Sequence, residues 1–252
     1  MAVDPADLAE PQFATEPVLT PQPEATEEVV FVDAKGTEPR ISHDAAKENL
    51  RTYFDKAEVG EDGKKKGWDW YRQEHDHLER AARAPGVHAS PEVFAGMVAA
   101  TSPRMRWESN IPAAQRAARL SSDHPEIEDM SEYVAGMDTP GMLRSNLMKA
   151  IRIHRGEDIA TVLGNKKTYN FHHNLVDPTG TEDMVTQDIW HQRAMLGGRD
   201  PSAKEAAYLA KPGYDWSADI VRELATEVSY TPQQLQAIIW TEIKRTWPRG
   251  LK

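Results

Sequence analysis

The chain has 252 residues, of which 39% are hydrophobic and 28% are charged, so it can form one large domain or two small ones around a packed core. It contains no cysteine, which excludes disulfides, thiolate zinc sites, iron–sulfur clusters and a cysteine nucleophile. The net charge of −10 argues, as an average, against a nucleic-acid partner, because phosphate binding favours a basic surface.

The first 40 residues differ in composition from the rest of the chain. They hold six of the 17 prolines and have nine acidic residues against two basic ones, so their net charge is −7. This composition predicts a disordered acidic tail over residues 1–40, in which the apolar run Val29–Val32 forms a short strand or docks on the body. Residues 41–252 carry 31 acidic and 28 basic residues, so the net charge of this body is −3 and does not argue against DNA.

From residue 43 onward the apolar residues recur with the period of a helix, and the body shows neither a convincing strand nor an internal repeat. Ser90-Pro91, Thr139-Pro140 and Thr231-Pro232 are each expected to open a helix. The small apolar run Phe94–Ala100 predicts a central, buried helix. The body is therefore predicted to be all-α, in one or two lobes, with about ten helices, at 44–57, 68–84, 91–102, 107–121, 140–155, 157–163, 166–176, 189–197, 202–210, 216–224 and 232–247.

Three motifs follow one another along this body. The first is the end of the buried helix, Ala100–Arg104, the second is a helix–turn–helix at Ile159–Thr168, and the third is Val185–Gly197. In this order they resemble the helix-hairpin-helix DNA glycosylase superfamily, which includes endonuclease III-like and 8-oxoguanine glycosylases. The segment Ser102–Asn110, which reads Ser-Pro-Arg-x-Arg-Trp-Glu-x-Asn, is also similar to a family of actinobacteriophage proteins.

The resemblance covers roughly residues 90–247 and implies roles for individual residues. Ser102 matches the serine of a loop that inserts into DNA, and Arg104 stands in place of that loop's glutamine. Gly164-Asn165-Lys166 matches the end of the hairpin, although the proline and the first glycine of the pattern are missing. Asp188 matches the catalytic aspartate, and the absence of cysteine excludes the iron–sulfur branch.

Asp188 and Lys166 are the catalytic candidates. A carboxylate can stabilise an oxocarbenium-like sugar and position or activate the nucleophile, although aspartate is also a preferred helix N-cap. The amine of Lys166 can attack C1′ of a nucleotide if its pKa is lowered, as in family members that also cleave the backbone. The alternative is a solvated lysine or one that only pairs with a phosphate, and the adjacent Lys167 makes the assignment ambiguous.

The remaining candidates bind DNA or line a pocket. A turn before a helix N-terminus offers backbone N–H groups to a phosphate, or is an ordinary helix cap, and arginine suits phosphate contact or the gap left by a flipped base. The predicted DNA-binding residues are Gly164, Asn165, Lys167, Ser102, Arg104 and Arg106. The predicted pocket residues, for which a structural role is the alternative, are Trp107, Asn110, His172 and His191.

Together these residues predict a DNA-binding, base-flipping enzyme, in first place a DNA glycosylase, with or without lyase activity, that excises a damaged or modified base. The alternatives are a phage base-modifying transferase on the same fold and a non-catalytic module that binds DNA or, through its acidic tail, a protein. We expect a monomer that acts on double-stranded DNA without cofactor or metal. Because the sequence has neither a secretory signal nor a stretch of roughly 18 apolar residues, we also expect no membrane contact and a cytoplasmic location. Lys166 and Asp188 should then face one cleft beside Arg104.

Overall fold

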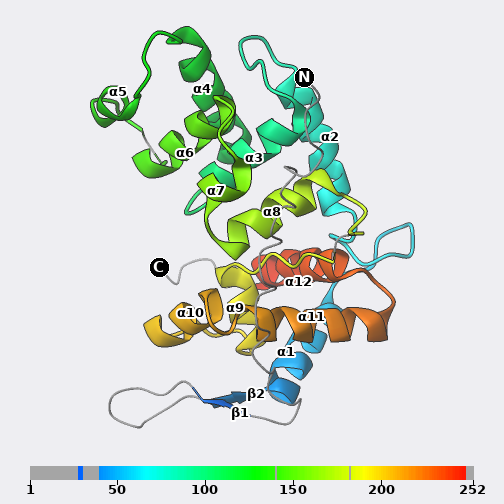
Figure 1. The fold of residues 1–252 in the computed structure, drawn as a ribbon. Coiled ribbons are helices and arrows are strands. Elements are labelled where there is room, and N and C mark those ends of the chain that lie inside the picture. Colours follow the sequence, from blue (N-terminus) through cyan, green and yellow to red (C-terminus); the bar gives the residue numbers. More distant parts are fainter. Residues whose placement is uncertain (1–27, 31–39, 140, 182, 248–252) are drawn as a thin grey trace, which may run out of the picture.

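The computed structural model describes residues 28–30, 40–139, 141–181 and 183–247 (Figure 1). Over these ranges the chain forms twelve helices and one pair of three-residue strands, so the prediction of an all-α body is confirmed. The predicted acidic tail lies outside the described residues, except for residues 28–30 and Arg40. No helix in the described ranges is both long and apolar enough to cross a membrane.

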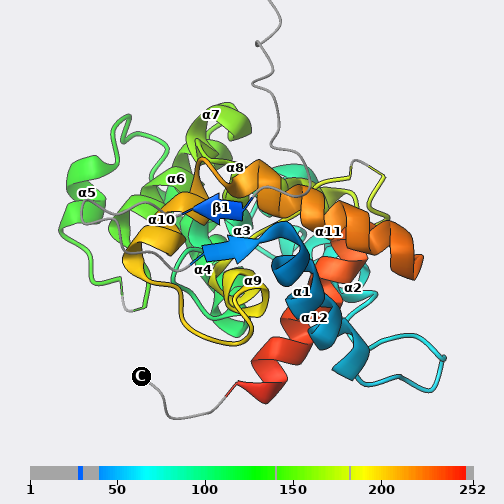
Figure 2. The ribbon, with the colours of Figure 1, turned by 90° about the horizontal axis from the view of Figure 1, so that it is seen from below.

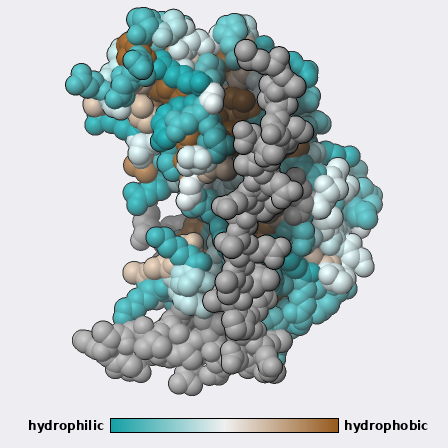
Figure 3. All heavy atoms as spheres, in the orientation of Figure 1, coloured by the Kyte–Doolittle hydropathy of each residue, from teal (hydrophilic) through white to brown (hydrophobic). Residues whose placement is uncertain are grey.

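Two hydrophobic clusters divide the helices into two lobes, which lie one above the other in Figure 1. The upper lobe contains α2 (Trp70–Ala82), α3 (Pro91–Thr101), α4 (Trp107–Asp123), α5 (Ser131–Ala135), α6 (Arg144–His154), α7 (Ile159–Leu163) and α8 (Lys166–Val176). The lower lobe contains α1 (His43–Lys56), α9 (Ile189–Met195), α10 (Ala203–Ala210), α11 (Tyr214–Val228) and α12 (Pro232–Thr246). On the face shown in Figure 3, hydrophilic residues predominate over both lobes.

Helix α3 is the centre of the upper lobe. Every residue from Phe94 to Thr101 is buried, as the small and apolar composition of this segment predicts. Ser90 caps the helix by accepting a hydrogen bond from the backbone N–H of Val93 at 3.2 Å, and Pro91 occupies the first turn. The absence of a side chain at Gly96 lets Ile159 approach, because a Cβ there would lie 3.1 Å from Ile159 Cγ2. The helix therefore forms a rigid base from which the α3–α4 loop projects.

Two expectations about helices were wrong. Helix α6 begins at Arg144 rather than at Thr139-Pro140, because the Thr139 hydroxyl donates to the carbonyl oxygen of Met142 in a loop; Pro140 itself lies outside the described residues. Helix α5 was not predicted, because it is too short to show a periodic pattern and, unlike the equally short α7 (Ile159–Leu163), it has no capping side chain at its start.

One of the two alternatives for Val29–Val32, a short strand, is met by a strand at Glu28–Val30, whereas the strand at Arg40–Ser42 was not predicted. Strand β1 (Glu28–Val30) pairs antiparallel with β2 (Arg40–Ser42), with Val29 opposite Ile41. Ser42 ends β2 and caps α1, because its hydroxyl accepts a hydrogen bond from the backbone N–H of Ala45. Figure 2 shows this small ribbon beside the start of α1, and Figure 1 shows it at the end of the lower lobe that is far from the upper one.

Buried polar contacts join the two lobes. The hydroxyl of Tyr71 on α2 donates to Gln236 Oε1 on α12 at 2.8 Å. On α8, Asn174 Nδ2 donates to Thr186 Oγ1 at 3.1 Å, and Asn174 receives a hydrogen bond on its carbonyl oxygen from Gln233 Nε2 at 2.8 Å. Because breaking any of these would leave a buried polar group unpaired, they fix the positions of α2, α8 and α12 around the space between the lobes.

Candidate functional site

A cavity of about 850 Å³ lies between the two lobes. Its walls come from α2, the α3–α4 loop and the start of α4, α8, the segment that leads into α9, and α12. The upper and lower lobes both contribute, so the cavity depends on how the lobes pack against each other. Its lining residues include Trp70, Tyr71, Ser102, Met105, Arg106, Trp107, Glu108, Ser109, Asn110, Lys167, Phe171, Thr186, Asp188, Trp190, Gln236, Ala237, Trp240 and Lys244.

Six aromatic side chains contribute to this lining. Trp70 is at the centre of the group: its ring centroid lies 5.0 Å from that of Trp107, 5.4 Å from that of Trp240 and 6.4 Å from that of Phe171. Tyr71 and Trp190 also line the cavity. Flat aromatic walls favour planar ligands, because stacking on a ring face is tolerant of the identity of the heterocycle. A nucleobase-sized ring system fits this chemistry.

Asp188 is held rigidly at the cavity wall. It is half-buried and is the N-cap of α9, where its Oδ1 accepts from the backbone N–H groups of Trp190 at 2.9 Å and His191 at 3.1 Å. Its other oxygen, Oδ2, accepts from the indole Nε1–H of Trp240 on α12 at 3.1 Å. Three donors therefore orient the carboxylate, and the helix-capping role and a role in the cavity coexist in one side chain.

Lys244, which the sequence analysis did not single out, brings an amine into the same cavity. Its Nζ lies 3.9 Å from the centroid of the Trp240 ring, so one indole contacts Lys244 with its face and Asp188 with its N–H. Burial lowers the pKa of the Lys244 amine, although the carboxylates of Glu108 and Asp188 act in the opposite direction. A lowered pKa increases the fraction of free amine, the form that can act as a base or nucleophile.

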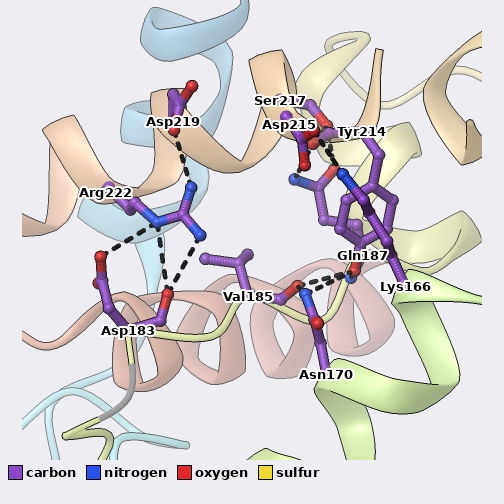
Figure 4. Close-up of polar contacts among 10 residues, drawn as sticks. All are labelled: Lys166, Asn170, Asp183, Val185, Gln187, Tyr214, Asp215, Ser217, Asp219 and Arg222. Atoms are coloured by element: carbon purple, nitrogen blue, oxygen red, sulfur yellow. Dashed lines mark hydrogen bonds and ion pairs between the residues drawn. The ribbon is translucent and has the colours of Figure 1, made fainter. Parts of the chain in front are cut away.

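Lys166 does not line the cavity, so the expectation that Lys166 and Asp188 face one cleft was wrong. Its Nζ pairs with the carboxylate of Asp215 on α11, and both side chains are more than half exposed (Figure 4). Its neighbour Lys167 lines the cavity instead. Successive residues of an α-helix point about 100° apart, so only one of two adjacent lysines can face the cavity.

The turn between α7 and α8 forms two ordinary helix caps. Gly164 is left-handed, with φ of 64°, and its N–H donates to the carbonyl oxygen of Ala160 at 3.0 Å. Asn165 caps α8, since its Oδ1 accepts from the backbone N–H of Thr168 at 3.1 Å. Neither residue lines the cavity. The caps account for both residues, and phosphate binding at this turn stays a prediction.

The loop between α3 and α4 contributes several of the predicted residues. Ser102, Arg106, Trp107 and Asn110 all line the cavity, whereas Arg104 faces an adjoining cleft. Asn110 is 1% exposed and links the two helices. Its Nδ2 donates to the carbonyl oxygen of Val98 at 3.1 Å, and its Oδ1 accepts from the hydroxyl of Thr101 at 2.6 Å. The role of Asn110 is therefore to hold the loop, and a role in ligand contact is secondary.

Neither His172 nor His191 lines the cavity, so their prediction as pocket residues was wrong. Both are buried, and the ring of His172 on α8 contacts that of His173. His191 is fully buried, its ring nitrogens have no hydrogen-bond partner within the described part of the chain, and burial lowers its pKa to about 4. The described residues contain no group of three or more His, Asp or Glu side chains that could hold a metal ion.

Comparison with known proteins gives a family but no described activity. No curated protein and no solved structure matches the chain. The model of DUF7178, a family of unknown function, matches residues 34–247 and so covers all helices and the site described above. Because this match spans most of the 252 residues, the chain belongs to the DUF7178 family.

Proposed function

We propose that the protein is a base-flipping DNA glycosylase, which binds double-stranded DNA and hydrolyses the N-glycosidic bond of a damaged or modified base. The observation that carries this proposal is the cavity in which Asp188 lies among six aromatic side chains. A flipped base stacks on the aromatic walls, which takes it out of the duplex and excludes water from its faces. A helix-hairpin-helix fold and a location in the cytoplasm are part of the same proposal.

Asp188 carries the chemistry in this proposal. Cleavage of an N-glycosidic bond develops positive charge on the sugar, and a nearby carboxylate stabilises that charge and positions the attacking water. The three donors that hold Asp188 fix its direction without neutralising its charge, because they are two backbone N–H groups and an indole N–H. Lys167, Arg106 and Lys244 line the same cavity and offer positive charge to the phosphates that flank the base.

The test is release of a free base. Purified protein is incubated with a panel of duplex oligonucleotides, each with one uracil, hypoxanthine, 8-oxoguanine or 5-hydroxymethyluracil, and with enzymatically modified phage DNA. Mass spectrometry then measures the free base, and alkali cleaves the strand at each abasic site. We expect base release by the wild type and none by Asp188→Asn, which keeps the size of the side chain and a capping oxygen.

Asp215→Asn is the matched control, because Asp215 is exposed, pairs with Lys166 and does not line the cavity. It should release base as the wild type does. If the protein binds every duplex and leaves all bases attached, excision is refuted. A mass gain on the base in the presence of a group donor would identify a transferase instead.

A further inference from the structure

A second cleft, of about 420 Å³, adjoins the aromatic cavity beside α4. The two share Met105, Arg106 and Ser109 as lining residues, so they form one continuous depression in the surface. Two further arginines, Arg104 and Arg116, line the second cleft. We call these three residues (Arg104, Arg106 and Arg116) with the space between them the arginine cleft. Arg116 was not a candidate in the sequence analysis.

No carboxylate of the described residues neutralises the charges of the arginine cleft. No aspartate or glutamate lines it, and none of its three guanidinium groups forms an ion pair with a carboxylate of the described residues. The only hydrogen bond from these side chains to the described chain runs from Arg116 Nη2 to the carbonyl oxygen of Asp138 at 2.9 Å. Eight other arginines of the described residues do pair with a carboxylate, for example Arg152 with Glu157. Within the part of the chain that the structure describes, three guanidinium groups around one cleft therefore have no counter-charge and present donors suited to an anion.

The backbone of the loop supports the same inference. Arg104 has a φ of 66°, in the left-handed region that a residue with a long side chain seldom adopts. Neighbouring contacts hold it there: the N–H of Met105 donates to the carbonyl oxygen of Ser102, and Asn146 Nδ2 donates to that of Pro103, both at 3.1 Å. The first turn of the 17-residue helix α4 follows directly and has no side-chain cap. An unfavourable conformation maintained in this way is typical of a functional position.

We infer that the arginine cleft binds a phosphate group of the nucleotide whose base occupies the aromatic cavity. This inference rests on the proposed function, which supplies the nucleobase as occupant of that cavity. The depression has two connected parts, and a nucleotide has two matching parts. Its planar base suits the aromatic walls of the cavity, and its phosphate suits the guanidinium groups of the arginine cleft. A free mononucleotide and the backbone of a DNA strand offer the same chemistry, and the experiment separates these two sources.

The test measures binding rather than excision. Fluorescence anisotropy follows binding of a fluorescein-labelled duplex that contains one abasic site, at several KCl concentrations, and calorimetry follows binding of deoxyadenosine monophosphate. The logarithm of the association constant falls linearly with log [KCl], and loss of one phosphate contact should make this slope less steep by about 0.9. This change corresponds to about eightfold weaker binding at 0.1 M KCl. We expect this change for Arg116→Gln and for Arg104→Asn.

Arg119→Gln is the matched control, because Arg119 lies on the same helix, donates to the carbonyl oxygen of Pro85 and does not line the cleft. It should leave the salt slope unchanged. Arg104→Asn is chosen because asparagine tolerates the left-handed region, so its melting temperature should equal that of the wild type. A binding defect without a loss of thermal stability separates a ligand contact from a structural role.

The possible outcomes are distinct. Weaker duplex binding by both cleft variants supports a strand phosphate as ligand, and weaker binding of the mononucleotide alone supports a free nucleotide. Equal effects of Arg116→Gln and Arg119→Gln, or no effect of either cleft variant on both probes, overturn the inference even if bases are released. If the protein releases no base but its binding depends on the cleft arginines, the proposed excision is refuted and the inferred phosphate site is supported.

Discussion

Acidification should destabilise this protein through one buried histidine. His191 is the third residue of α9, is 0% exposed, and has both ring nitrogens without a hydrogen-bond partner among the described residues. Burial lowers its pKa to about 4, and the nearby carboxylate of Asp188 offsets only part of this effect. The folded protein therefore keeps the imidazole neutral in a range of pH in which an unfolded chain protonates it.

The magnitude follows from the two pKa values. In the unfolded chain histidine has a pKa of about 6.5. Between pH 6.5 and 4 the unfolded state binds a proton that the folded state excludes, so the free energy of unfolding falls as the pH falls. Above about pH 6.5 the burial of neutral His191 does not reduce the free energy of unfolding. As the pH falls, the free energy of unfolding decreases, and the decrease reaches about 3 kcal/mol once the pH is below 4. Between pH 7 and pH 5 the loss is about 2 kcal/mol.

Urea unfolding at pH 7, 6 and 5, followed by circular dichroism, measures this loss. His191→Leu removes the titrating group and leaves no buried polar atom unpaired, so its unfolding free energy should change by about 2 kcal/mol less than that of the wild type over the same range. The comparison does not depend on how stable the variant is at pH 7. If wild type and His191→Leu lose the same stability between pH 7 and pH 5, the histidine is not buried and neutral as described.

Three further predictions concern the residues around the cavity. Asp188→Ala removes an N-cap and the acceptor for Trp240, so it should cost about 2 kcal/mol in urea unfolding, whereas Asp188→Asn keeps a capping oxygen and should cost about 1 kcal/mol less; equal costs would show that the cap contributes nothing. Asn110→Ala should cost about 1–2 kcal/mol, because it removes two buried hydrogen bonds between α3 and α4, and an unchanged unfolding midpoint would contradict that role. Lys244 should be acetylated faster than Lys47 at pH 8, as measured by peptide mass spectrometry. The reason is that burial lowers the pKa of Lys244, whereas the hydrogen bond to Glu223 raises the pKa of Lys47. Faster acetylation of Lys47 would show that the pKa of Lys244 is not lowered.

Local sequence signals predicted the helix ends well. Ser90 and Thr231 cap α3 and α12 as expected, because a cap depends on residues within one turn of each other. The turn at Gly164-Asn165 was located correctly for the same reason. The same kind of signal failed at Thr139, where the hydroxyl bonds a carbonyl three residues on and the chain stays in a loop until Arg144.

The site was predictable only in part, because it depends on contacts between lobes. Asp188, Trp107 and Arg106, all singled out from the sequence, line the cavity, and each lies directly at the start of a helix. Lys166 was chosen over Lys167 on the basis of a motif, but the rotation of α8 against the lower lobe decides which of the two faces the cavity. Lys244 was missed because the sequence does not show that this face of α12 meets the upper lobe; its only signal is Trp240 one turn earlier.

The net charge of the chain is a poor guide to its ligand, because its charges are unevenly compensated. On the side where α1 meets α11, acids and bases neutralise each other: Lys47 contacts Glu223 and Glu227, and Arg51 contacts Glu227. Around the depression formed by the aromatic cavity and the arginine cleft, no carboxylate pairs with Lys167 or with the three arginines in the described part of the chain. Unpaired cations there produce a local positive potential that an average over the whole chain conceals. The negative net charge therefore does not contradict the inferred phosphate site, and the binding that we infer there should weaken as salt is added.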